Sequence, residues 1–281
     1  HEPSRRQRQM CIRDRVQAQT TSASLVKPAE LVDVVELTPL KLIDRRAFNL
    51  MLGAAWKTIS EDVEHSIPKS ELRPDSSHSV GERLDNCIGR LMGARVKVSI
   101  ERDGKPYTLN IPLLETVAEP LRADGNVYYR FPRELRKLVL DSNVFARLRK
   151  DVMFALTSKY ALALYEIIQK RGNLNFKTTE KFSIKDLREL LGVPNGKLQA
   201  YKNFKAKALL PAVTEVQGLA DFGVTFHEIK ESRAVKTIEI SWWKKSEEEL
   251  KAVWQELHSS KVGRRIRLKE RMPMKSNVGP S

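Results

Sequence analysis

The order of secondary-structure patterns along the chain is the feature that most constrains its fold, because one order occurs twice. Apolar residues repeat at helical spacing over residues 40–54, and a short element is expected at 68–73. A capping box at Ser79-x-x-Glu82 begins a further helix. Alternating apolar residues over 96–111, interrupted by Asp103-Gly104, then predict a β-hairpin. The first half therefore has the order helix, short helix, helix, hairpin.

The second half has the same order without visibly repeating the sequence. Helical patterns are expected after Ser158, over 184–191 behind a capping box at Ser183, and over 198–212. Alternating residues over 222–242 predict a second hairpin, with basic residues in its connection. A helix–turn–helix followed by a hairpin is the pattern of a winged helix. The sequence thus predicts an α+β fold of two tandem winged-helix domains.

A length of 281 residues also favours two domains. We expect a disordered or artefactual N-terminal segment at 1–24, a first domain at 25–131, a second domain at 132–260 and a basic flexible tail at 261–281. Residues 10–16 look like a translated sequencing adapter, and we exclude residues 1–16 from the fold. The alternative is a native basic arm.

The composition excludes several classes of protein. No apolar run approaches the roughly 18 residues of a membrane span. The chain has two cysteines, Cys11 and Cys87, and no CxxC pair, so neither a disulfide framework nor a cysteine-based zinc site is expected. We therefore expect a cytoplasmic protein that has no contact with a membrane.

Basic residues are concentrated in the second half of the chain. Residues 17–127 contain 14 basic and 16 acidic side chains, whereas residues 128–260 contain 24 basic and 16 acidic ones. A polyanion should meet the second half, where cationic side chains displace counterions from phosphates. A solvated basic surface is the alternative, because charge alone does not identify a partner.

The predicted helix at 198–212 is the candidate reader of DNA. At about 100° per residue, its outward face includes Gln199, Asn203, Ala206 and Lys207, while Lys202 borders that face and Lys205 projects toward the apolar side. Amide side chains suit adenine, and a lysine suits guanine or a phosphate. An ordinary solvated helix face is the competing interpretation. The complete set of candidate DNA-binding residues is Lys197, Gln199, Lys202, Asn203, Lys205, Ala206, Lys207, Lys230, Arg233 and Lys236.

The motifs of DNA-processing enzymes are missing from the sequence. The five histidines form no metal-binding pair near a nucleophilic tyrosine, as a nicking enzyme would need. No G-x-x-x-x-G-K-[ST] phosphate loop occurs, so a helicase lacks its ATP site. We therefore expect no catalysis, no metal and no cofactor.

Eight short segments follow the pattern of one family. They are Leu25–Pro28, Leu37-Thr38, Asp44–Leu50, Arg90–Met92, Ser158–Glu166, Leu187–Val193, Tyr201-x-x-Phe204-Lys205 and Leu210-Pro211-Ala212-Val213-x-Glu215. Over residues 25–245 the chain resembles the iteron-binding plasmid replication initiators. The resemblance implies a first domain used largely for dimerisation, a second that reads origin repeats, dimers that repress and monomers that initiate. It departs at Ala163, where many relatives carry arginine, so no phosphate contact is carried over to that position.

Two functions remain open from the sequence. One is a replication initiator that binds origin direct repeats in double-stranded DNA and opens the origin with host initiator and helicase proteins. The other is a winged-helix transcriptional repressor that acts at an operator. Direct repeats of about two helical turns in the neighbouring DNA would favour the initiator, and a lone inverted repeat would favour the repressor.

Overall fold

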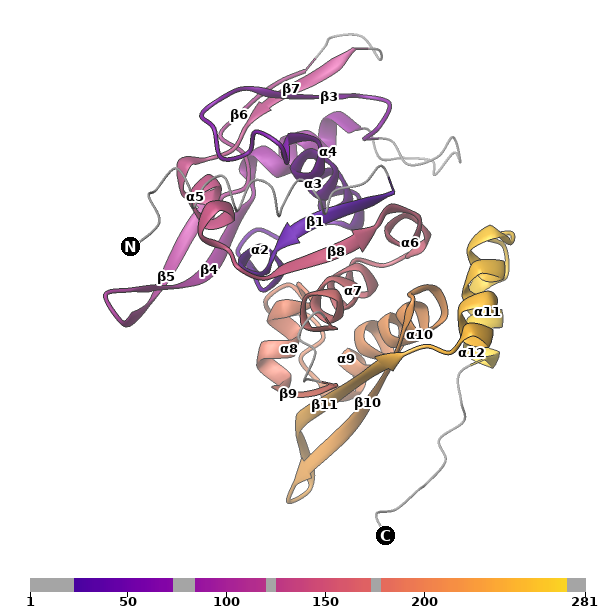
Figure 1. Ribbon diagram of the computed structural model, residues 1–281. Helices are drawn as coiled ribbons and strands as arrows, with labels where there is room; N and C mark the ends of the chain where they lie inside the picture. Colours follow the sequence, from indigo (N-terminus) through magenta and orange to yellow (C-terminus); the bar gives the residue numbers. More distant parts are fainter. Residues whose placement is uncertain (1–22, 73–83, 120–124, 173–177, 272–281) are drawn as a thin grey trace, which may run out of the picture. The chain divides into compact units, whose positions relative to one another are not determined.

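The computed structural model describes residues 23–72, 84–119, 125–172 and 178–271. These residues divide into two compact units. The first unit extends to Phe154 and includes the last turn of helix α7 (Lys159–Gly172); the rest of α7 and the chain from residue 178 belong to the second unit. Both units combine helices with small antiparallel sheets (Figure 1), so the α+β prediction is confirmed.

The strands described in the first unit form three small antiparallel sheets, with the orders β1-β8, β2-β4-β5 and β3-β7-β6. Their strands are β1 (Ser24–Pro28), β2 (Val35–Glu36), β3 (His65–Pro68), β4 (Arg95–Arg102), β5 (Lys105–Pro112), β6 (Thr116–Ala118), β7 (Asn126–Arg130) and β8 (Phe145–Arg149). Pairing of β8 with β1 keeps the chain in this unit well beyond residue 131, where the sequence analysis placed the first boundary.

The core of the first unit forms around helix α3 (Leu42–Ala55), which is buried on nearly all sides. The unit also contains α2 (Ala29–Val32), α4 (Leu84–Gly93), α5 (Arg133–Asp141) and α6 (Lys150–Ala155). The rings of Phe48 on α3 and Phe131 pack edge to face with their centres 6.1 Å apart, and the Tyr129 hydroxyl donates to the carbonyl of Met51 at 2.5 Å. The capping box expected at residues 79–82 lies outside the described residues.

The hairpin β4–β5 follows the sequence prediction. Arg102 pairs with Lys105, and the two residues between them, Asp103 and Gly104, have φ values of 52° and 69°. Positive φ at both central residues is what a two-residue turn needs to match the twist of its strands. Glycine adopts this conformation without a steric penalty, and aspartate tolerates it.

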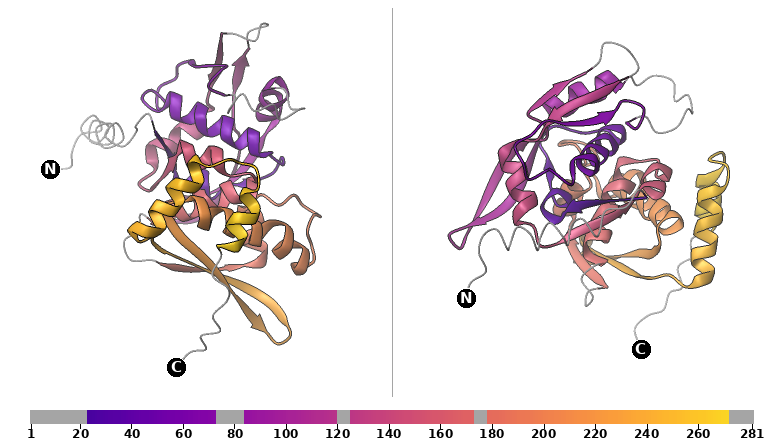
Figure 2. Two further views of the ribbon diagram at one scale, coloured as in Figure 1. Left: turned by 90° about the vertical axis from the view of Figure 1, so that its right-hand side faces the viewer. Right: turned by 45° about the horizontal axis from the view of Figure 1, so that its top comes forward.

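The second unit is a winged helix with two additional helices. Its elements after α7 are β9 (Thr179–Ser183), α8 (Ile184–Leu190), α9 (Tyr201–Phe204), the π-helical turn η1 (Lys205–Leu209), α10 (Leu210–Leu219), β10 (Phe222–Glu231), β11 (Ala234–Lys244), α11 (Glu247–His258) and α12 (Arg264–Glu270). Strand order in its sheet is β10-β11-β9. Figure 2 shows β10 and β11 projecting from the helices of this unit as a long ribbon, the wing.

Residues 264–270, predicted as part of a flexible tail, instead form helix α12. The carboxylate of Glu256 on α11 is 1% exposed and accepts hydrogen bonds from Arg264 at 3.3 Å and from Arg267 at 2.5 Å. Leu268 is buried and lies over Gly218 on α10, where a β-carbon would come within 2.3 Å of it. The sequence pattern of α12 is mainly basic, so its order depends on these tertiary partners.

None of the helices in the described residues combines the length and the apolar character that crossing a membrane requires.

Candidate nucleic-acid interface

The helix–turn–helix of the second unit starts at Ser183, the predicted N-cap of α8. The hydroxyl of Ser183 accepts a hydrogen bond from the backbone N–H of Asp186 at 3.0 Å, which satisfies a free donor in the first turn of α8. Helix α8 ends at Leu190, and Gly192 follows with a φ of 70°. A left-handed glycine just after a helix is a common terminator.

The second helix of the helix–turn–helix, which was predicted at residues 198–212 and is called the recognition helix below, begins later than the sequence predicts. Leu198 has a φ of 49°, which no residue inside an α-helix adopts, so the helix starts at Tyr201. Lys197 and Gln199, which the helical projection placed at its start, are exposed residues of the preceding turn. The prediction that the helix begins at residue 198 was therefore wrong, because a left-handed residue gives no periodic signal.

One arginine holds this turn against the recognition helix. Arg188 on α8 donates from Nη2 to the carbonyl oxygen of Gln199, and its guanidinium lies 5.1 Å from the ring centre of Phe204. Phe204 is fully buried. The contact therefore connects the start of the recognition helix to the core of the unit.

Helices α9, η1 and α10 form one continuous helical segment from Tyr201 to Leu219. In the π-helical turn η1, the N–H of Leu210 bonds to the carbonyl of Lys205, five residues earlier. The cause is the next residue, Pro211, which has no N–H to donate and whose ring crowds the carbonyl one turn before it. The wider turn accommodates the proline without breaking the helix.

The exposed side of this segment is a narrow row of side chains. Asn203, Ala206 and Lys207 are exposed, as the projection predicted, and so is Lys202. Leu210, which the sequence analysis did not assign, is also 40% exposed. It follows Asn203 by two helical turns, so the same projection could have found it. The buried side of the segment consists of Phe204, Ala208, Leu209, Ala212, Val213, Val216 and Leu219.

The carboxylate of Glu228 on β10 connects the wing to the recognition helix by a hydrogen bond and an ion pair. Its Oε1 accepts from the Tyr201 hydroxyl at 2.7 Å and also pairs with the ammonium of Lys205. Burial and the neighbouring carboxylate raise the pKa of Tyr201 well above its usual range. The ammonium of Lys205 also lies 5.9 Å from the ring centre of Phe226. The charge of Lys205 is thus already compensated within the protein.

The outer half of the wing carries exposed cations. Lys230, Arg233 and Lys236 are all exposed, with Arg233 in the turn between β10 and β11. Ser232 in that turn has a φ of 58°, and the strand register shifts between Ile229 and Lys230. This arrangement places positive charge along the ribbon, next to the recognition helix to which Glu228 connects it.

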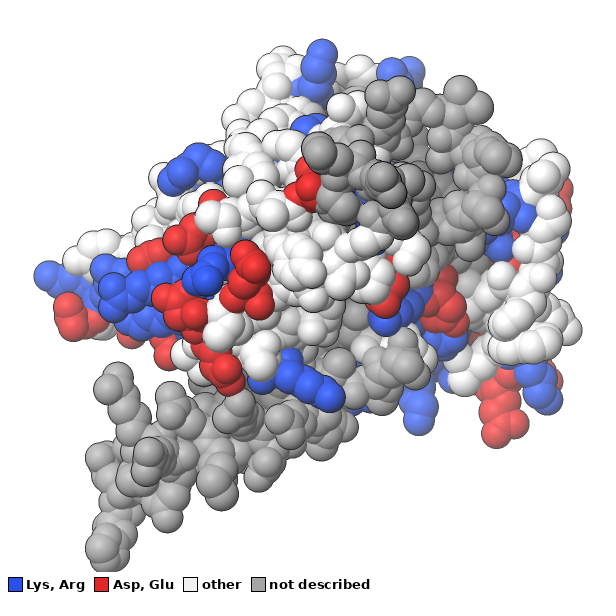
Figure 3. Space-filling model, turned by 90° about the horizontal axis from the view of Figure 1, so that it is seen from above, with Lys and Arg blue, Asp and Glu red and all other residues white. Residues whose placement is uncertain are grey.

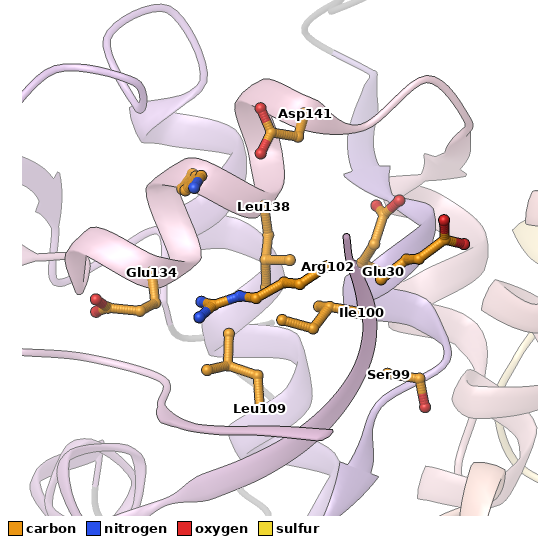
Figure 4. A pocket seen from close by; sticks show the side chains of 10 residues that line it. Glu30, Ser99, Ile100, Arg102, Leu109, Glu134, Leu138 and Asp141 are labelled. Atoms are coloured by element: carbon orange, nitrogen blue, oxygen red, sulfur yellow. The ribbon is translucent and has the colours of Figure 1, made fainter. Parts of the chain in front are cut away.

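On the face shown in Figure 3, the basic and acidic side chains of the described residues of the first unit are interspersed. A pocket of about 290 Å³ lies between α2, the β4–β5 hairpin and α5 (Figure 4). Arg102 extends across it past Leu138 toward Glu134 (Figure 4). The carboxylates of Glu30, Glu101, Glu134 and Asp141 line the pocket with Arg102 and Lys137. Four carboxylates against two cations do not favour binding of a phosphate.

Within the described residues, no group of three or more His, Cys, Asp and Glu side chains is arranged to hold a metal ion.

The aromatic residues His65 and Trp242 belong to the core. The ring centre of His65 lies 5.7 Å from that of Tyr129, and burial lowers the pKa of His65. Trp242 is buried and Trp243 is exposed, as expected for two consecutive strand residues.

Comparisons with known proteins match both units. The family model described as "Initiator Replication protein, WH1" matches residues 24–169, and the model described as "Initiator Rep protein, WH2" matches residues 183–242. Among solved structures, the chain is similar to the Pi initiator protein, which was crystallised with iteron DNA. That match has 19% identity and a TM-score of 0.54, and it covers 80% of this chain and 98% of the other. These findings confirm the tandem winged-helix prediction.

The chain also shows a weaker similarity to domains 2 and 3 of RctB, with 11% identity and a TM-score of 0.41, over 78% of this chain and 85% of that one. No curated protein sequence matches it significantly.

Proposed function

Because the chain belongs to the initiator replication protein family, we propose that it initiates plasmid replication by binding direct repeats, or iterons, in double-stranded origin DNA. The observation that carries this proposal is the exposed row on the recognition helix, Lys202, Asn203, Ala206 and Lys207, beside a basic wing. The Pi initiator protein, which shares the fold, was crystallised with iteron DNA and supports the same kind of ligand.

The recognition helix enters the major groove, which at about 12 Å in width admits one α-helix. Asn203 can donate to and accept from the edge of an adenine, and Ala206 leaves room for close approach. Lys202 and Lys207 address guanine or a phosphate. Lys197 and Gln199 precede the first turn, where backbone N–H groups also favour a phosphate.

Lys230, Arg233 and Lys236 in the wing contact the phosphate backbone beside the groove. Such contacts position the protein and carry no sequence information. Lys205 has a different role, since its ammonium is paired with Glu228. It orients the wing relative to the recognition helix and does not contact a phosphate.

The second unit, up to residue 260, forms the main DNA-binding part, and the first unit, which continues past residue 131 to Phe154, serves for dimerisation with an auxiliary DNA contact. In support, β5 is the edge strand of its sheet in the described residues, and an edge strand is a template for pairing with a strand of a second copy. Residues 17–127 have no excess of basic over acidic side chains. The proposal includes an equilibrium between a homodimer and a monomer that is competent to bind DNA. The monomer opens the origin together with host initiator and helicase proteins in the cytoplasm, and no bond is cut by the chain itself.

The proposed reading mechanism is tested by separating specificity from general affinity. Asn203→Ala should lose about 1–3 kcal/mol of discrimination between a cognate and a scrambled site if the amide bonds adenine twice. Replacing Lys230 and Arg233 should weaken binding to both sites equally and reduce the salt slope by about one per lost phosphate contact. If Asn203→Ala keeps the cognate-to-scrambled ratio and the wing variant abolishes it, this helix is not the reader.

A transcriptional repressor would use the same helix at an operator. Footprinting of the full-length protein on the DNA that adjoins its gene separates the two functions. Protection of several direct repeats supports the initiator, whereas protection of one inverted repeat alone would identify a repressor. Nicking of supercoiled DNA during the same incubation would show that the chain is an enzyme.

A further inference from the structure

The row of exposed side chains on the recognition helix ends in a large apolar residue. Leu210 exposes 40% of its surface, whereas every later residue of the helical segment, 211–219, is buried or half-buried. Its neighbour Leu209 is fully buried and fills the core position. Leu210 therefore keeps a large apolar surface exposed, and its position one turn after Ala206 makes the end of the row apolar.

The backbone at Leu210 is held on both sides. Its N–H bonds to the carbonyl of Lys205 in the π-helical turn, and its own carbonyl accepts from the hydroxyl of Thr214 at 2.8 Å. Pro211 follows directly and has a fixed φ. An apolar side chain on an anchored backbone presents a defined surface to whatever lies against the helix.

In the major groove, the apolar feature of a base edge is the C5-methyl group of thymine. Neither guanine nor cytosine presents such a group there. Resting on the proposed function, which places this helix in the major groove, we propose that Leu210 contacts the C5-methyl group of a thymine and is a specificity-determining residue. The charged and amide side chains of the row are suited to hydrogen bonds, and Ala206 presents only one methyl group a full turn earlier, so Leu210 is the large apolar contact at the end of the row.

The helix geometry gives the position of this thymine. Leu210 follows Asn203 by seven residues, which correspond to about 10 Å along the helix axis. Base pairs are spaced by roughly 3.4 Å. The methyl-dependent thymine should therefore lie about three base pairs from the base that Asn203 reads, for a helix that runs along the groove.

The experiment uses full-length protein and sites selected from a random duplex pool. In a selected duplex, each thymine is replaced singly by deoxyuridine, which differs only in lacking the C5-methyl group, and binding is measured by fluorescence anisotropy. The wild type should lose about fourfold in affinity at one thymine, the factor that burial of one methyl group carries at 25 °C. Leu210→Ala should bind the thymine and uracil forms equally. The matched control is Leu250→Ala, because Leu250 is 37% exposed on α11, outside the row.

Each outcome is decisive. Loss of the methyl dependence in Leu210→Ala, with retention in Leu250→Ala, supports the inference. A wild type that tolerates uracil at every position, a selected site without thymine near the Asn203-dependent base, or a Leu210→Ala protein that still distinguishes thymine from uracil overturns it and leaves the proposed function intact. A pool that yields no preferred sequence overturns both.

Discussion

Replacing Glu228 by glutamine should weaken the fold and strengthen DNA binding in one step. The carboxylate of Glu228 accepts from the Tyr201 hydroxyl at 2.7 Å and pairs with the ammonium of Lys205. Glutamine keeps an oxygen for the tyrosine and removes the charge that holds the lysine. The ammonium of Lys205 then becomes available to a phosphate.

The size of both effects follows from the exposure of the pair. The side chains of Lys205 and Glu228 are 30% and 23% exposed, so the pair is neither a surface pair nor a buried one. Exposed pairs contribute up to about 1 kcal/mol and hydrogen bonds to charged groups about 1.5–3 kcal/mol. We expect Glu228→Gln to lower the free energy of unfolding by about 1 kcal/mol. One additional phosphate contact steepens the salt dependence of binding to B-DNA by about 0.9 in the logarithmic slope.

Urea unfolding measures the first effect, and anisotropy titrations at several salt concentrations measure the second. Glu239→Gln is the matched control, because Glu239 lies on the outer face of β11 and pairs at 3.8 Å with Lys181 on β9. If Glu228→Gln leaves the slope unchanged while Lys205→Met reduces it, Lys205 already contacts a phosphate and the reasoning fails. Equal increases for Glu228→Gln and Glu239→Gln would show a general charge effect only.

Three further predictions concern the C-terminal part of the second unit. Arginine partners, first of all Arg267, lower the pKa of Glu256. The ionised carboxylate therefore stabilises the fold at neutral pH, and this contribution is lost as the pH falls through the folded-state pKa. Glu256→Gln should be less stable than wild type at pH 7, and the difference in unfolding free energy should vanish in acid. Gly218→Ala should be more destabilising, in thermal unfolding, in the wild type than in a Leu268→Ala background, where the new methyl group has room; equal effects in both backgrounds would contradict the packing argument. Burial lowers the pKa of Lys245 to about 8, so around and above this pH the folded state binds fewer protons than the unfolded state. The unfolding free energy of the wild type should therefore rise relative to that of Lys245→Met by about 1 kcal/mol between pH 7 and 9. A difference between the two proteins that does not change with pH would refute the shift.

Much of the second unit could be predicted from neighbouring residues alone. The cap predicted at Ser183 is present, since its hydroxyl accepts the backbone N–H of Asp186, and Ser246 with Glu249 forms a complete capping box at the start of α11 by the same spacing rule. The exposed side of the recognition helix carries Asn203, Ala206 and Lys207, because helical periodicity determines which residues share a face. The assignment of these residues to DNA contact stays a prediction. The family resemblance stated from short segments is confirmed by the family models.

Tertiary structure decided what depends on distant or irregular partners. Pairing of β8 with β1 joins residues more than a hundred positions apart, and no local pattern in either strand specifies the other. The left-handed Leu198 shortens the recognition helix, and Glu228 on the wing pairs with the ammonium of Lys205.

Helix α12 shows the same limit most clearly. Its sequence is basic and has little helical periodicity. The helix is held by Glu256, whose carboxylate accepts from Arg264 and Arg267 and compensates arginine charges that would otherwise repel one another. The sequence by itself therefore determined the two hairpins, the helix–turn–helix of the second unit and the outward face of the recognition helix, since these depend on spacings of a few residues. Only the tertiary structure decided which charges are already paired and at which residue the recognition helix begins, because these depend on groups brought together from different elements and on irregular backbone.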